Sequence, residues 1–351
     1  MTIKDILEKA ISSHASDIHI NVGSPPTLRI EGELSPVPGT EVVTAEVAKE
    51  MVLELLTPTQ KEIFLASKEF DLSYAYKDTR FRVNVYHQRG FMGVALRLIP
   101  FEIPTIEELG LPPVLSDFCK LPQGFVLITG PTGEGKSTTI AAMLESINRE
   151  RSVHIVTVED PIEYVFEPKL SIIDQREVHQ DTHSWEIALR SVLREDPDIV
   201  LIGEMRDFET VSAAVTIAET GHLVFATLHT NSAAQTVDRI IDVFPENQQR
   251  QIRIQLASII EGIISQRLVP SLDGRRVPAT EILLANSAIR NIIREGKTHQ
   301  IDNVIATSYD LGMISLERSL ATLVKENKIS SEVAKGYTLR PEEVSRLVSK
   351  V

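Results

Sequence analysis

The octapeptide at residues 130–137, Gly-Pro-Thr-Gly-Glu-Gly-Lys-Ser, constrains the fold more than any other feature of the chain. It matches the phosphate-binding motif G-x-x-x-x-G-K-[S/T], whose glycines let successive backbone N–H groups point at phosphate oxygens. The motif needs a strand before it and a helix after it, and the apolar run Phe125–Thr129 directly precedes it. Lys136 is therefore expected to contact nucleotide phosphates, and the Ser137 hydroxyl to ligate Mg²⁺. We predict an ATP and Mg²⁺ site formed by Gly130, Pro131, Thr132, Gly133, Glu134, Gly135, Lys136, Ser137 and Thr138.

Three more apolar runs alternate with helical segments after this motif: His154–Val158, Ile199–Ile202 and Leu223–Leu228. Continuous apolar runs are typical of strands buried on both faces of a parallel sheet. The sequence therefore predicts an α/β core.

Carboxylates follow two of these runs. A hydrolase needs a carboxylate to hold or activate the attacking water, and ligands of parallel sheets sit at the carboxyl ends of the strands. Gly203 occupies the position where many P-loop proteins have the aspartate that organises Mg²⁺. Glu204 is then the best candidate for the catalytic base, and Glu159 or Glu163 is expected to compensate near the metal.

Two histidines bracket the run Leu223–Leu228. His229 follows its carboxyl end, on the side expected for phosphate, so it is a catalytic candidate. His222 precedes the run, which favours a structural or interface contact, although a neighbouring site could use it. Their spacing is not that of a metal-binding pair.

Residues 1–100 are predicted to form a small α+β domain, because short alternating runs and amphipathic segments are separated by Gly and Pro turns. In the run 80–86, Phe81, Val83 and Val85 share one face and the arginines share the other. The helices are expected at 3–13, 45–56 and 58–67, and the strands at 17–20, 27–31, 33–37, 69–76, 80–86 and 93–98. We predict a linker at 101–111, which overlaps the helix-breaking segment Pro100–Pro104, a core at 112–285 and a helical region at 286–351.

The charge disfavours one class of protein, and the cysteine content excludes two kinds of structural feature. A net charge of −13 makes the chain a poor generic binder of nucleic acid, since such binding rests on neutralising phosphates. The single cysteine, Cys119, excludes an intrachain disulfide and a Cys-rich zinc site. The sequence has neither an apolar stretch of membrane-spanning length nor a signal-peptide core at its start, which favours the cytoplasm.

Four segments in this order resemble the secretion ATPase superfamily, the motors of type II secretion and type IV pili. They are a Walker A loop at 130–138, an Asp box at 156–166, an atypical Walker B strand at 199–204 and a His box at 220–229. Gly203 is itself a trait of that superfamily. The resemblance implies a RecA-like P-loop core with a smaller PAS-like α+β domain before it and a helical region after it.

Within the superfamily, three features resemble the pilus retraction branch. The 351 residues leave no room for a long extra N-terminal region, and the C-x-x-C zinc module of assembly and secretion motors is missing. The third is an octapeptide that matches the branch's AIRNLIRE signature except for one conservative exchange, at Ile292. It consists of Ala288, Ile289, Arg290, Asn291, Ile292, Ile293, Arg294 and Glu295, and its spacing predicts an amphipathic helix.

This resemblance implies a homo-hexameric ring that hydrolyses ATP between the N-terminal domain and the core, and that drives pilus retraction and twitching motility. Arg82 and Arg97, on predicted strands, are the candidates to complete the site. The ring is expected to be cytoplasmic and peripheral at the inner membrane, docked on a pilus platform protein without direct membrane insertion. We expect no stable nucleic-acid partner.

Other functions stay open at this point. An accessory retraction motor shares the length and the cysteine content, whereas a pilus-assembly or type II secretion ATPase predicts the zinc module. A nucleotide-regulated switch or a DNA-translocating NTPase shares only the P-loop chemistry. The sequence leaves open the direction of force, the firing order and symmetry of the ring, the cellular role of the pilus, the presence of a paralogous motor and the arginines that act across the interface.

Overall fold

The computed structural model describes residues 2–30, 32–77, 79–99 and 102–349. It divides into two compact units, Met1–Glu102 with Pro161–Val165, and Ile103–Asp160 with Phe166–Val351. The predicted boundaries at residues 100, 111 and 285 stay predictions. Pro100 and Phe101 of the expected linker lie outside the described residues.

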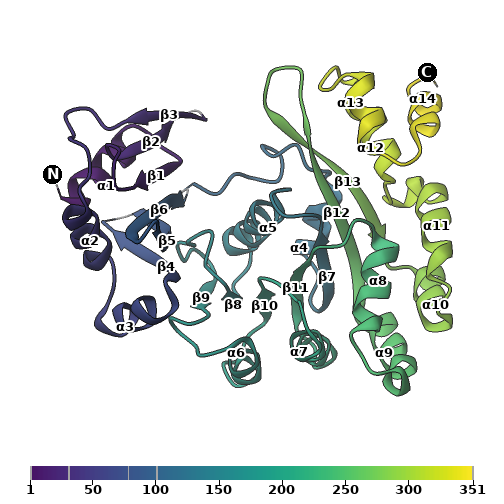
Figure 1. The fold of residues 1–351 in the computed structure, drawn as a ribbon. Helices are drawn as coiled ribbons and strands as arrows, with labels where there is room; N and C mark the ends of the chain where they lie inside the picture. The colour runs from purple at the N-terminus through teal and green to yellow at the C-terminus, as the bar shows by residue number, and fades with distance from the viewer. Residues whose placement is uncertain (1, 31, 78, 100–101, 350–351) are drawn as a thin grey trace. The chain divides into compact units, whose positions relative to one another are not determined.

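The first unit is a six-stranded antiparallel sheet with strand order β3-β2-β1-β6-β5-β4, and three helices pack on it (Figure 1). Side chains of helices and strands such as Ile6, Phe64 and Phe81 are fully buried between the two layers. Every helix and strand expected here is present. They are α1 (Ile3–Ser12), β1 (Asp17–Ile20), β2 (Thr27–Ile30), β3 (Glu33–Pro36), α2 (Ala45–Glu54), α3 (Pro58–Ser67), β4 (Glu69–Tyr76), β5 (Thr79–Gln88) and β6 (Phe91–Ile99).

The second unit contains a seven-stranded sheet with strand order β13-β12-β7-β11-β10-β8-β9. Its strands from β12 to β9 pair in parallel, and β13 is antiparallel to β12 at the edge. All residues of β7, β10 and β11 are buried, which explains their continuous apolar sequences. The strands are β7 (Gly124–Thr129), β8 (His154–Glu159), β9 (Ile172–Glu177), β10 (Ile199–Ile202), β11 (Leu223–Leu228), β12 (Ile260–Pro270) and β13 (Arg276–Leu284).

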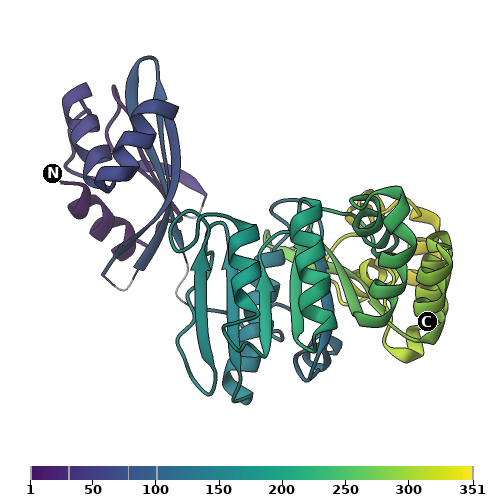
Figure 2. The same cartoon turned by 90° about the horizontal axis from the view of Figure 1, so that it is seen from below.

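Helices cover both faces of this sheet. One face carries α4 (Val114–Cys119) and α5 (Lys136–Glu150). The other carries α6 (Trp185–Val192), α7 (Phe208–Glu219), α8 (Ala233–Asp242) and α9 (Glu246–Ile259), and Figure 2 views the sheet from the side of α6 and α7. The predicted α/β core is therefore confirmed.

The chain after the sheet is helical, as expected. α10 (Ser287–Glu295) packs against α9, and α12 (Leu316–Lys325) packs against the edge strand β13. Val269 and Ala279 join Leu320 and Val344 in a small separate core there. The remaining helices are α11 (Ile301–Thr307), α13 (Ser331–Gly336) and α14 (Pro341–Ser349).

Strands β9, β12 and β13 were not expected from the sequence. β12 and β13 form a long hairpin with pairs from Gly262↔Leu284 to Pro270↔Arg276. Their polar residues, such as Gln266 and Glu281, interrupt the apolar pattern that made the central strands recognisable. The hairpin extends the sheet beyond β7, the strand that leads into the phosphate-binding motif at residues 130–137, called the phosphate loop below.

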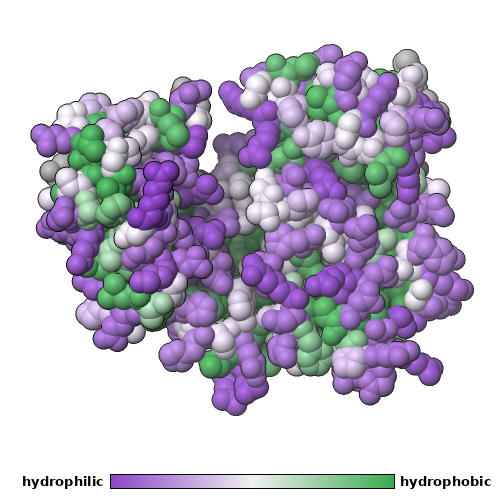
Figure 3. Space-filling model, in the orientation of Figure 1, coloured by the Kyte–Doolittle hydropathy of each residue, from purple (hydrophilic) through white to green (hydrophobic). Residues whose placement is uncertain are grey.

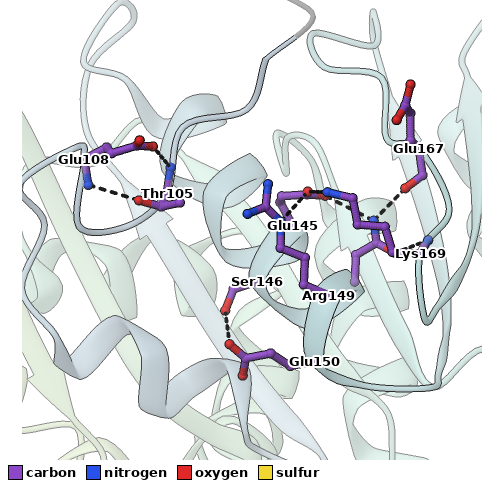
Figure 4. A network of polar contacts seen from close by, with 9 residues as sticks. Thr105, Glu108, Glu145, Ser146, Arg149, Glu150, Glu167 and Lys169 are labelled. Atoms are coloured by element: carbon purple, nitrogen blue, oxygen red, sulfur yellow. Dashed lines mark hydrogen bonds and ion pairs between the residues drawn. The ribbon is translucent and has the colours of Figure 1, made fainter.

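A buried polar network ties the carboxyl half of α5 to residues 167–170 (Figure 4). Glu145 is 6% exposed and accepts hydrogen bonds from Lys169 and Arg149. Burial raises the pKa of Glu145, but these two cations outweigh it and hold the pKa below its ordinary value. Asn148 donates to the carbonyl of Glu167 at 2.8 Å and accepts from the N–H of Lys169 at 3.0 Å. The segment after the Asp box is thus fixed to the helix that starts at the phosphate loop.

Hydrophilic residues predominate on the face of the second unit shown in Figure 3, with hydrophobic residues scattered among them. Among the described residues, every helix is too short or too polar to cross a lipid bilayer.

Candidate nucleotide site

The phosphate loop connects β7, which ends at Thr129, to α5, which begins at Lys136. At two positions of the loop, the backbone conformation and the close neighbours allow only glycine. Gly130 has a φ of 145°, and a side chain there would collide with the carbonyl oxygen of Gln266. Gly135 has a φ of 78°, and a Cβ atom there would lie 2.9 Å from Nε2 of Gln266. The loop is therefore pressed against β12.

The ammonium group of Lys136 lies inside the loop. The residue is 8% exposed, and its Nζ atom donates to the carbonyls of Gly130 at 2.8 Å and Pro131 at 2.9 Å. Ser137 and Thr138 follow in the first turn of α5 and are partly exposed, and Thr132 and Gly133 are exposed at the tip of the loop. This arrangement presents a cation and the positive end of a helix at one place, which suits a phosphate group.

Glu204 lies just beyond the end of β10, which pairs with both β8 and β11. Its Oε1 atom lies 2.8 Å from Nε2 of His229, and its Oε2 atom accepts from Arg206 at 2.6 Å. Burial raises the pKa of Glu204, but the hydrogen bond from Arg206 and the neighbouring His229 outweigh it and hold the pKa below its ordinary value. The carboxylate therefore stays ionised at neutral pH.

His229 connects Glu204 to the phosphate loop. Its Nδ1 atom lies 3.5 Å from Nζ of Lys136, while its Nε2 atom faces Glu204. A lysine ammonium can only donate, so Nδ1 accepts and the ring proton lies on Nε2, which donates to the carboxylate. The side chains of Lys136, His229, Glu204 and Arg206 thus form one continuous polar chain. Arg206 was not singled out in the sequence, although its position two residues after Glu204 was a signal.

Glu159 lies at the end of β8, at the same edge of the sheet as Glu204. It is buried, and its carboxylate accepts from the Thr157 hydroxyl at 2.7 Å and from Nε2 of Gln175 at 3.3 Å. Glu163 is exposed and belongs to the segment 161–165, which is grouped with the first unit. Of the two acidic candidates, Glu159 is therefore the one that the second unit itself places beside the end of β10.

His222 lies at the opposite end of β11 from His229. Its Nδ1 atom is 2.9 Å from the carbonyl of Ile217 and 3.0 Å from the hydroxyl of Thr220, both at the carboxyl end of α7. The structure thus brings His229 to Lys136 and Glu204 and leaves His222 at the far edge of the sheet.

Arg82 and Arg97 lie opposite each other on β5 and β6, on the face of the first sheet away from its core. Arg97 is also opposite Asp17 of β1, and its Nε atom donates to the Asp17 carboxylate at 2.9 Å. Burial raises the pKa of Asp17, but hydrogen bonds from Ser16 and Arg97 hold it below its ordinary value. Two guanidinium groups therefore share one row across the sheet, and one of them is held by a carboxylate.

The signature octapeptide forms most of α10, as predicted. Ile289, Ile292 and Ile293 are buried. Arg290 donates to the carbonyls of Ala257 and Ser258, both at 2.9 Å, near the carboxyl end of α9. Arg294 is exposed. Part of this signature is therefore used to join α10 to α9.

The sequence model of the type II/IV secretion system protein family matches residues 1–302. The chain belongs to this family.

Curated relatives within the family extend along nearly the whole chain. A type IV pilus retraction ATPase, PilT, from Pseudomonas aeruginosa is 44% identical over 343 residues, which cover 97% of this chain and 99% of the relative. The type IV pilus ATPase PilU from the same organism is 37% identical over 339 residues, with 96% and 88% covered. A crystal structure of the pilus retraction motor PilT with bound ADP has a TM-score of 0.92 and 45% identity, and 99% of each chain is covered. The RecA-like fold with a smaller N-terminal domain is confirmed.

Proposed function

We propose that this chain is an ATP-hydrolysing motor that retracts type IV pili. The observation that carries the proposal is the contact of His229 with both Lys136 and Glu204, which joins the phosphate loop to a carboxylate in a chain 44% identical to a retraction ATPase. The 37% identity to a second type IV pilus ATPase, PilU, keeps a pilus ATPase with another role, such as an accessory retraction motor, as the second candidate.

In this proposal, the backbone of residues 130–138 and the Lys136 ammonium bind the phosphates of ATP. The Ser137 hydroxyl holds Mg²⁺, with Glu159 and Glu204 at the same edge of the sheet. Hydroxyl and carboxylate oxygens are ligands that suit this ion. When bound, Mg²⁺ neutralises charge on the β- and γ-phosphate oxygens.

Glu204 orients the attacking water and polarises it. While Arg206 is bonded to it, the low pKa of Glu204 makes it a weak base. Release of Arg206 toward the nucleotide raises that basicity at the moment when the carboxylate is needed. His229 keeps the carboxylate aligned with Lys136 through this step.

The functional assembly in this proposal is a ring of six copies. Arg82 and Arg97 complete the nucleotide site from the N-terminal domain, where a guanidinium group near the transferred phosphoryl group is worth about 10³–10⁵ in rate. Domain closure on ATP and reopening on product release then convert phosphate contacts into rigid-body motion about the segment Pro100–Pro104. The ring works in the cytoplasm, docked on a platform protein of the pilus machine at the inner membrane.

Removal of the Glu204 charge tests the chemistry. Glu204→Gln in the purified protein should bind ATP like the wild type and lose at least 99% of its turnover, because the amide cannot take a proton from water. Lys136→Ala should weaken both binding and turnover. Glu186→Gln, an exposed glutamate on α6, is the matched control and should leave both unchanged. Retained turnover in Glu204→Gln would falsify the assignment.

The cellular role needs its own measurement. The chain, or Glu204→Gln, is expressed in a cell that lacks its retraction motor, and labelled pili are imaged. Shortening that only the wild type restores supports the proposal. Extended pili despite active hydrolysis favour the accessory motor, and turnover that rises with added DNA favours a translocase.

A further inference from the structure

Strand β12 continues past the end of β7 and runs beside the phosphate loop. Ser265 is the last residue of β12 paired with β7, opposite Thr129, and the two hydroxyl groups are 2.8 Å apart. On their other side the next residues, from Gln266 to Leu268, stay paired with β13, but on the side where β7 has ended they lie next to the loop. The loop thus has a neighbouring backbone on one side along much of its length.

The side chain of Gln266 is 3% exposed and forms two hydrogen bonds, one to the phosphate loop and one to α5. Its Nε2 atom donates to the carbonyl of Glu134 at 2.6 Å, and its Oε1 atom accepts from the Thr139 hydroxyl at 2.8 Å. The carbonyl of Glu134 can only accept, which fixes the orientation of the amide. One side chain therefore contacts both the loop and the first turns of α5.

Side chains of the β12–β13 hairpin donate hydrogen bonds to two consecutive carbonyl groups of the loop. Gln266 holds that of Glu134, and Nη1 of Arg276 donates to that of Gly133 at 3.3 Å. In a planar trans peptide, the C=O and N–H groups point in opposite directions. The N–H groups of Glu134 and Gly135 are therefore turned away from the hairpin. The Glu134 carboxylate also accepts from the N–H of Leu268, which fixes the same residue at a third point.

We infer that Gln266 is a positioning residue for nucleotide binding: by holding the Glu134 carbonyl, it keeps the N–H of Gly135 directed at the phosphates. The inference rests on the proposed nucleotide site and adds a residue about 130 positions away to it. Without nucleotide, Lys136 also stabilises the loop through the carbonyls of Gly130 and Pro131. When phosphates draw the ammonium away, Gln266 remains to keep the loop in its binding shape.

The test compares Gln266→Met with Thr139→Val, measured with ADP as the probe. Gln266→Met keeps the length of the side chain and removes both hydrogen bonds, so the Kd for ADP should rise about tenfold. The KM for ATP should rise by a similar factor, with kcat changed less than about threefold, because the variant alters binding and not the attacking water. Thr139→Val removes only the bond to Oε1, so it should lower the Tm while leaving the Kd for ADP within about twofold of the wild type.

The outcomes separate three interpretations. If both variants lower the Tm and both bind ADP like the wild type, Gln266 is merely a core residue and the inference is wrong. If Gln266→Met does not fold, Gln266→Glu replaces it, since it keeps the acceptor for Thr139 and, when ionised, replaces the donor to Glu134 with a negative charge. An unchanged Kd for ADP in that variant also overturns the inference. Failure of the wild type itself to bind ADP instead overturns the proposed function.

Discussion

The Nε2 atom of His229 lies 2.8 Å from Oε1 of Glu204, while the other ring nitrogen lies 3.5 Å from the Lys136 ammonium. A single imidazole thus contacts both the lysine of the phosphate loop and the candidate base. It follows directly after β11, whose six residues are all buried, so the backbone that carries it is held in the centre of the sheet. One side chain therefore connects Lys136 of the phosphate loop to Glu204.

Substitution of this histidine should slow hydrolysis more than it weakens binding. In His229→Ala, Glu204 loses one of its two fixed partners, and misplacement of a catalytic group by about 1 Å costs on the order of 10²-fold in rate. We expect kcat to fall about 10–100-fold and the Kd for ADP to change less than threefold. His299→Ala, at an exposed histidine, is the control. A turnover equal to that of the control would remove His229 from the catalytic group.

Gly203 should not tolerate a side chain. A Cβ atom there would lie 3.2 Å from the carbonyl of Val158 and 3.3 Å from Cα of Glu159, and this part of β8 is fixed by the sheet. Gly203→Ala should therefore lower the free energy of unfolding by about 1–2 kcal/mol, measured by urea denaturation. Gly203→Asp, which introduces the aspartate that many P-loop proteins have at this position, should lower the free energy of unfolding by more than Gly203→Ala.

Gly336 provides the matched control, because a Cβ atom at this end of α13 meets nothing within 4 Å. Gly336→Ala should leave stability unchanged or raise it by up to about 1 kcal/mol. Equal effects of alanine at the two glycines would contradict the steric explanation.

Glu281 should make stability depend on pH. Burial, with the nearby Asp302 and Glu317, raises its pKa to about 7, although the N–H of Ala233 and the Arg340 side chain oppose the shift. In the unfolded chain the group ionises near 4.5. Between these values the folded protein binds more protons than the unfolded one, so stability falls as the pH rises through this window, by at most about 3 kcal/mol.

Glu281→Gln isolates this contribution, because the amide oxygen can still accept from Ala233, as the carboxylate does at 2.7 Å. Urea denaturation at pH 5, 6, 7 and 8 should show the variant gaining stability relative to the wild type as the pH rises. A difference that stays constant from pH 5 to pH 8 would show that Glu281 is ionised throughout.

Arg290 should contribute to the stability of the fold, whereas Arg294, the other arginine of the signature octapeptide, should not. Besides its two bonds to α9, it donates from Nη2 to the Glu261 carboxylate at 2.7 Å. Lysine cannot reproduce this forked geometry, so Arg290→Lys should destabilise the fold by about 1–3 kcal/mol. Arg294→Lys, at an exposed position, should change it by less than about 0.5 kcal/mol. Thermal unfolding of the two variants checks the difference, and equal Tm values would contradict it.

The sequence alone was enough to predict the parts of the candidate site that follow from local sequence patterns. The phosphate loop is contiguous, and Glu204 and His229 each follow an apolar run, so the rule for the carboxyl ends of parallel strands brings them together. Gln266 could not be found this way, because its role depends on the pairing of β12 with β7 across more than 130 residues. The same limit applies to Arg82 and Arg97, whose position opposite each other follows only from the register of β5 and β6.

Helix α5 has 15 residues, which makes it a rigid rod about 22 Å long. Its first turn directly follows the phosphate loop, and Glu145 and Asn148 nearer its other end form hydrogen bonds with residues 167–170. Because backbone hydrogen bonds keep the length of a helix constant, a tilt at the nucleotide end displaces the far end as well. In the proposed motor, a change at the phosphates would therefore also move residues 167–170, which follow the Asp box and are held about 14 to 18 Å along the helix.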